Sequence, residues 1–125
     1  MEYQIEVRDT GESMSMADED WRYLLKLAGI FGWNPVAGVD YYLSIPPPDV
    51  IPESDSRYLG QTLNKVVPTL PARSGPINLP LPQEGVSFME LRNYFGGERK
   101  GVVEEFVRLC QLGDLTVRRR LQSEL

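Results

Sequence analysis

The chain has 125 residues, 42% of them hydrophobic and 25% charged, and its formal net charge is −5 at pH 7. It contains no histidine and a single cysteine. This composition excludes Ser–His and Cys–His nucleophiles and the usual imidazole and thiolate ligand sets of zinc. The acidic balance disfavours nucleic acid as a partner. We therefore expect no metal and no cofactor, and any catalysis would have to use carboxylates, lysines or tyrosines.

The length predicts a single domain over residues 1–125. No apolar run approaches the ~20 residues that span a bilayer, which predicts a protein without a membrane segment. The N-terminus is acidic and alternating, unlike a secretory signal, and the single Cys110 permits no internal disulfide. These features predict a cytoplasmic protein.

A strand is predicted over residues 2–8, where apolar and polar side chains alternate. A helix should follow. Ser15 and Asp18 have nearly the spacing and chemistry of a capping box, and Gly32 with Pro35 beyond it is typical of a helix end. The expected apolar stripe of this helix comprises Trp21, Leu24, Leu25, Ala28 and Phe31.

The middle of the chain is rich in proline. A short strand is predicted at "YYLSI", Tyr41–Ile45, and residues 46–82 then hold nine of the ten prolines. Such density opposes continuous helix or central strand and predicts an irregular segment wrapped on the domain. One helix should interrupt it near 54–67, with a buried stripe of Tyr58, Leu59, Thr62, Leu63 and Val66.

Two more helices and a strand complete the predicted elements. A short helix begins near Ser87 and ends at Gly96, and a second covers 102–110. The final stretch, "DLTVRRRL", has the alternation of a strand. It can pair with the first strand because the outward charges have opposite signs: Glu2 and Glu6 against Arg118 and Arg120. The predicted class is α+β, with about four helices packed on a small sheet formed by the two terminal strands.

Two stretches, "WRYLLKLAGIFGWNPVAG" and "YFGGERKGVVEEFVRLCQLGDLTV", resemble a family of small bacterial proteins of uncharacterised function. In that family a Trp-x-x-Leu-Leu-x-Leu-Ala helix precedes Gly-Trp-x-Pro, and a Glu-Phe helix carrying a Cys is followed by Gly and a strand. The residues that match are Trp21, Leu24, Leu25, Leu27, Ala28, Gly32, Trp33, Pro35, Glu105, Phe106, Cys110, Gly113, Leu115 and Val117. The central "RYLGQTLNKVV" departs from the family's alanine-rich helix. The resemblance implies the architecture and no activity or site.

Five residues are candidates for contact with a partner or ligand. Trp33 lies past the end of the first helix, outside its apolar stripe and beside Asn34. A tryptophan at a helix exit usually folds back over the core with its indole N–H near the surface, and this position leaves a recognition role open. Asp40, Tyr41 and Tyr42 lie between two turn signals, where polar side chains can line a cleft.

The leading functional hypothesis is a non-catalytic protein-interaction module, of which an inhibitor or immunity protein is one form. The alternative is a small-molecule binder or a hydrolase that uses carboxylates and tyrosines in a cleft near residues 40–42. A pocket of roughly 300 Å³ or more at that place would favour the alternative. A third expectation is a homo-oligomer that forms through an edge strand, since a small sheet leaves its edges unpaired.

Overall fold

The computed structural model describes residues 2–43, 49–73 and 88–120. Its strands are β1 (Glu2–Val7), β2 (Ser13–Ala17), β3 (Val50–Ile51) and β4 (Leu115–Arg120). Its α-helices are α1 (Asp18–Ile30), α2 (Val39–Tyr42), α3 (Glu53–Val66), α4 (Phe88–Tyr94) and α5 (Lys100–Cys110). Single 3-10 turns follow α3, at Val67–Thr69, and precede α5, at Gly97–Arg99. The predicted α+β class is confirmed.

The four strands form one antiparallel sheet in the order β2-β1-β4-β3. As predicted, the two terminal strands pair, and they occupy the centre of the sheet, with Ile5 opposite Val117. The register places Glu2 opposite Arg120, Gln4 opposite Arg118 and Glu6 opposite Thr116. The register therefore places a residue of opposite charge across from Glu2 but not across from Glu6.

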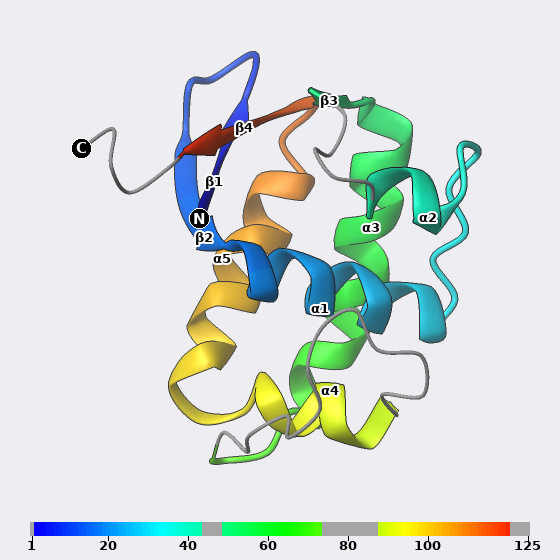
Figure 1. The fold of residues 1–125 in the computed structure, drawn as a ribbon, viewed down its shortest axis with the longest axis vertical. Helices are drawn as coiled ribbons and strands as arrows, with labels where there is room; N and C mark the ends of the chain where they lie inside the picture. Colours follow the sequence, from blue (N-terminus) through cyan, green and yellow to red (C-terminus); the bar gives the residue numbers. More distant parts are fainter. Residues whose placement is uncertain (1, 44–48, 74–87, 121–125) are drawn as a thin grey trace.

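The helices cover one face of this sheet (Figure 1). Tyr3, Ile5 and Val7 of β1 point into the core between the layers, each at most 1% exposed. The polar residues that alternate with them are half-buried on the other face. Helices α3 and α5 pack side by side beneath the sheet, and α1 crosses in front of them in the view of Figure 1. Alternation of side chains thus decides which face of the sheet is buried.

The capping box expected at Ser15 and Asp18 is wrong. Ser15 lies in strand β2, and α1 begins at Asp18 with Ala17 as its N-cap and no side-chain hydrogen bond there. Residues 13–16 alternate serine with methionine, which fits the edge of a half-buried sheet. Asp18 instead accepts a 2.7 Å hydrogen bond from the Tyr3 hydroxyl, so its carboxylate joins α1 to the neighbouring strand.

The strand expected at Tyr41–Ile45 is also wrong. Residues Val39–Tyr42 form the single turn α2 instead, and the Leu43 N–H closes it on the carbonyls of Val39 and Asp40. Gly38, with φ of 87°, supplies the left-handed conformation that leads into this turn. Ser44 and Ile45 lie outside the described residues.

The helix predicted near 54–67 is confirmed as α3. Four of its five predicted stripe residues are buried, whereas Tyr58 is exposed. No side chain of its own caps its N-terminus. Asp114, from the turn before β4, does so: its Oδ1 accepts a 2.6 Å hydrogen bond from the Glu53 N–H. Much of the proline-rich segment that was predicted to wrap on the domain, 46–48 and 74–82, lies outside the described residues.

Candidate functional site

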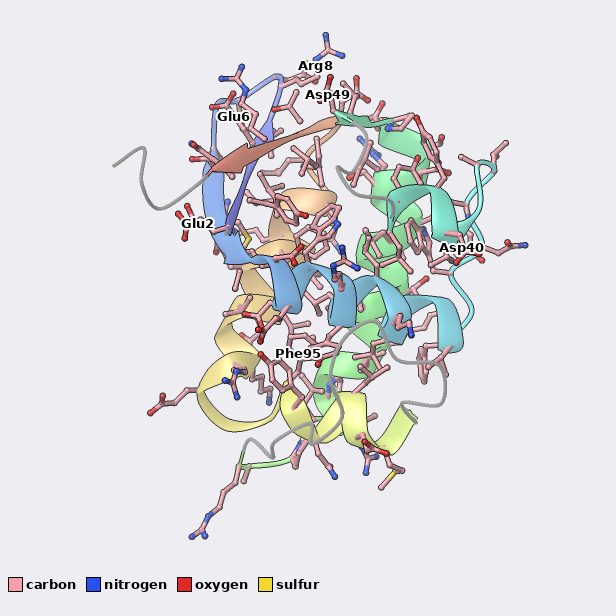
Figure 2. The ribbon with its side chains drawn as sticks, in the orientation of Figure 1. Glu2, Glu6, Arg8, Asp40, Asp49 and Phe95 are labelled. Atoms are coloured by element: carbon pink, nitrogen blue, oxygen red, sulfur yellow. The ribbon has the colours of Figure 1, made fainter. Side chains whose placement is uncertain are left out.

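The five candidate residues divide between the core and the surface. Trp33 and Tyr42 are each 1% exposed, while Asn34, Asp40 and Tyr41 are exposed. The sequence predicted that the indole N–H of Trp33 would lie near the surface, and this is wrong: the N–H is buried and donates to the carbonyl of Asp55 in α3. Neither buried ring forms part of the surface that a partner would meet. Figure 2 shows Asp40 on the side of the molecule opposite Glu2 and Glu6 of β1.

A buried aspartate holds the two rings together. Asp55, in the first turn of α3, is 7% exposed. Its Oδ2 accepts a 2.7 Å hydrogen bond from the Tyr42 hydroxyl, and its carbonyl oxygen accepts one of 3.2 Å from Trp33 Nε1. The centroids of the Trp33 and Tyr42 rings lie 5.6 Å apart. The turn between α1 and α2 is therefore fixed to α3 by packing and by hydrogen bonds.

The same contacts make Tyr42 unsuitable as a catalytic acid or base. Burial is the main cause that raises the pKa of its hydroxyl, and the hydrogen bond to Asp55 raises it further. The hydroxyl therefore stays protonated even above the ordinary titration range of tyrosine, and it donates a hydrogen bond to the carboxylate of Asp55, which solvent barely reaches. The arrangement has the properties of a structural tie.

Large apolar side chains are exposed on the segments that this tie joins. Phe31 follows α1, Val36 lies in the connection to α2, Tyr41 is in α2 and Tyr58 is on α3; Val36 is 99% exposed and Tyr41 is 51% exposed. The Tyr58 hydroxyl donates a 2.6 Å hydrogen bond to the Gly32 carbonyl, which brings α3 to the end of α1. We define the corner surface as Phe31, Asn34, Val36, Asp40, Tyr41 and Tyr58.

Sequence reasoning missed half of the corner surface. It predicted Phe31 and Tyr58 as buried stripe residues and did not consider Val36. Phe31 lies just past the last residue of α1, where the helical period no longer determines which way a side chain points. The Val-Ala pair before Gly38 was the available signal, because connecting segments run over the protein surface.

Two hollows in the described part of the chain lie away from residues 40–42. One of about 330 Å³ is open on the outer face of the sheet, beside Asp49, Val50 and Arg118. Another, of about 480 Å³, is lined by residues 72–73 and 97–99. Neither borders Asp40, Tyr41 or Tyr42, so neither supplies the pocket that the small-molecule alternative requires.

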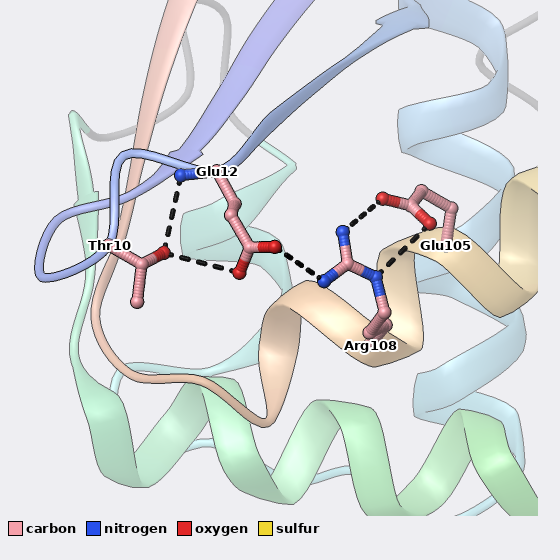
Figure 3. Close-up of polar contacts among 4 residues, drawn as sticks. All are labelled: Thr10, Glu12, Glu105 and Arg108. Atoms are coloured by element: carbon pink, nitrogen blue, oxygen red, sulfur yellow. Dashed lines mark hydrogen bonds and ion pairs between the residues drawn. The ribbon is translucent and has the colours of Figure 1, made fainter.

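A polar network on the surface joins the β1–β2 turn to α5 (Figure 3). Arg108 Nη1 contacts Glu12 Oε1 at 2.9 Å, and its Nη2 contacts Glu105 Oε1 at 2.6 Å. The hydrogen bond from Arg108 lowers the pKa of Glu105. All three side chains are more than 40% exposed, so the pairs are screened by water and contribute little stability.

Comparison of the chain with protein-family models finds no match, and comparisons with curated proteins and with solved structures give no significant match. The resemblance drawn from two stretches of the sequence thus receives no support from a family match.

Among residues 2–43, 49–73 and 88–120, no group of three or more His, Cys, Asp or Glu side chains is placed to hold a metal ion. None of the helices in these ranges is long and apolar enough to cross a membrane.

Proposed function

We propose that this protein is a non-catalytic protein-interaction module and that the corner surface is its contact site. The observation that carries the proposal is the exposure of Phe31, Val36, Tyr41 and Tyr58 on segments that hydrogen bonds join, since Tyr58 bonds to Gly32 and Tyr42 bonds to Asp55. Aromatic residues dominate the binding energy of protein interfaces when a partner buries them, and exposed apolar clusters mark such interfaces.

The support beneath the corner surface favours binding over chemistry. Tyr41 packs edge-on against buried Tyr42, with 5.2 Å between ring centroids, and Tyr42 is tied to Asp55 of α3. A surface held in this way loses little conformational entropy when it binds, which improves affinity. Asp40 and Asn34 add a polar rim, and the acidic side chain of Asp40 favours a partner with basic or hydrogen-bond-donating groups beside an apolar pocket.

We also propose that the protein acts in the cytoplasm, on the basis of its single free cysteine.

The proposal is tested by capture of a partner from the lysate of the native host. Tyr41→Ala removes an exposed ring from the corner surface, and Met89→Ala removes an equally exposed apolar side chain from α4, elsewhere on the molecule. We expect a protein that is retained by the wild type and by Met89→Ala and is lost with Tyr41→Ala, after circular dichroism shows that both variants are folded. Retention by all three proteins, or by none, would count against the corner surface as the contact site.

A further inference from the structure

The strand β2 forms an edge of the sheet with no strand beside it in the described part of the chain. It pairs with β1 on one side, where Ile5 lies opposite Met14 and Tyr3 opposite Met16. In Figure 1 this edge lies at the upper left, away from α2. Its outward side is a row of backbone N–H and C=O groups that can pair with another strand.

The hydrogen-bond pattern fixes which residues face outward. The Val7 N–H donates to the Glu12 carbonyl at 2.8 Å, so these two residues form a hydrogen-bonded pair. Hydrogen-bonded and non-hydrogen-bonded pairs alternate along an antiparallel ladder. Met14 and Met16 therefore direct their backbone groups toward β1, whereas Ser13 and Ser15 direct theirs away from it.

This edge lacks the usual protection against pairing. Its sequence, Ser-Met-Ser-Met-Ala, has no charged residue and no proline, the two devices with which proteins most often block edge strands. The outward side chains of Ser13 and Ser15 are exposed and small, so a neighbouring strand can approach without a clash. On the helix side, Met14 is only partly buried and would be covered by such a strand.

We propose that two copies of this chain associate through β2, antiparallel, with Ser15 of each copy opposite Ser15 of the other. This register is self-complementary. It places Ser13 opposite Ala17 and Met14 opposite Met16, so small residues meet small ones on the outer face and flexible methionines meet on the helix side. The two Ser15 residues exchange their backbone hydrogen bonds, and the two four-stranded sheets become one continuous sheet.

The charges at the ends of the strand permit this register. Glu12 of one copy lies opposite Asp18 of the other, and two carboxylates in such positions would ordinarily repel. Each already has an arginine partner in its own chain: Glu12 contacts Arg108 at 2.9 Å (Figure 3), and Asp18 contacts Arg22 at 3.3 Å. Because β2 and α2 lie on opposite sides of the molecule, the pair leaves α2 of both copies, with Asp40 and Tyr41 of the corner surface, open. The assembly would therefore present two binding sites.

Disulfide trapping in the full chain tests the register. In a hydrogen-bonded antiparallel pair the Cα atoms are about 5.5 Å apart, within the range that a disulfide bridges. Ser15→Cys should thus form a covalent dimer rapidly under mild oxidation. Ser13→Cys is the matched control, since it is an equally small, exposed position on the same strand and face. In the proposed register the two residues at position 13, one from each chain, are four positions apart along the strand. Their Cα atoms would be roughly 14 Å apart, which is beyond the reach of a disulfide.

We expect at least about a tenfold faster initial rate of dimer trapping for Ser15→Cys than for Ser13→Cys, the contrast between a paired and an out-of-reach position. Native Cys110 is fully buried and does not compete. Equal rates for the two variants, or faster trapping of Ser13→Cys, would overturn the register.

Sedimentation of the wild type at high concentration gives a second measurement. A dimer that Ser15→Pro weakens supports the proposal, because proline removes an outward N–H and leaves the hydrogen bonds between β2 and β1 intact. A wild type that remains monomeric overturns it.

Discussion

At the scale of single residues, tyrosine–aspartate pairs connect the parts of this molecule. Tyr3 donates to Asp18, Tyr94 to Asp20 and Tyr42 to Asp55, each at 2.7 Å. Every one of these aspartates lies in the first turn of a helix, where the helix dipole already favours a negative charge. The acidic run at the start of α1 therefore does more than favour the helix terminus, since two of its three carboxylates hold other elements against α1.

The Tyr42–Asp55 pair is the most buried of the three, and its loss should be measurable. Tyr42→Phe leaves the Asp55 carboxylate buried without its hydroxyl donor, which should lower the free energy of unfolding by about 1–3 kcal/mol. Urea unfolding followed by tryptophan fluorescence measures the change. Asp55→Asn keeps a side-chain oxygen that can accept a hydrogen bond from the Tyr42 hydroxyl, and it should therefore cost less stability than Asp55→Ala. A Tyr42→Phe variant as stable as the wild type would show that this hydrogen bond contributes no net stability.

At the scale of elements, the contact between α3 and α5 depends on a glycine. A Cβ at Gly60 would lie 2.8 Å from the Cβ of Cys110, which is closer than two non-bonded carbon atoms approach each other. The same two helices are joined by a 2.9 Å hydrogen bond from the Ser56 hydroxyl to the Cys110 carbonyl. Gly60 lies within a helix, where glycine is intrinsically unfavourable, so close helix packing accounts for its presence.

Two alanine substitutions separate packing from helix propensity. Gly60→Ala should destabilise the protein by about 1–3 kcal/mol, because the added methyl group overpacks the α3–α5 contact. Gly101→Ala, in α5, places its Cβ in open space and should stabilise by about 0.5–1 kcal/mol through helix propensity alone. Thermal unfolding of both variants gives the comparison. If both raise the melting temperature, the close approach at Gly60 is relieved at little cost and the packing argument fails.

At the scale of the whole molecule, stability should fall in alkaline solution. Burial raises the pKa of the Cys110 thiol and of the Tyr42 and Tyr94 hydroxyls above their ordinary values of 9.0 and 10.0. The native state therefore keeps these protons at a pH at which the unfolded state has lost them. The stabilisation that results is fully present below about pH 9 and declines as the pH rises through and above these ordinary values.

Urea unfolding at about pH 8 and at about pH 10.5 tests this dependence. We expect a lower midpoint at the higher pH. Tyr42→Phe removes one of the titrating groups and should reduce the difference between the two midpoints. A midpoint that is constant or that rises with pH would contradict the protonated, buried state of these groups.

Local pattern was sufficient wherever a residue's position depends on its own neighbours in sequence. The alternation of Tyr3, Ile5 and Val7 predicted β1 and its buried face, and the helical spacing in α1 and α3 predicted those helices. The pairing of the terminal strands was predicted from their opposite outward charges, and the pairing is confirmed although the register places Thr116 and not an arginine opposite Glu6. The absence of histidine excluded several catalytic arrangements without any structure.

Only the tertiary structure decided the features that depend on residues distant in sequence. Ser15 lies in a strand and not at a helix N-cap because β2 pairs with β1. Tyr41 lies in a helical turn because that turn lets the Tyr42 hydroxyl reach the buried Asp55. The same packing buried Trp33 and left Phe31 and Tyr58 exposed, which moved the candidate contact site from the tryptophan to the corner surface. Burial and exposure at the ends of elements are set by what packs against them, and that information is spread over the whole chain.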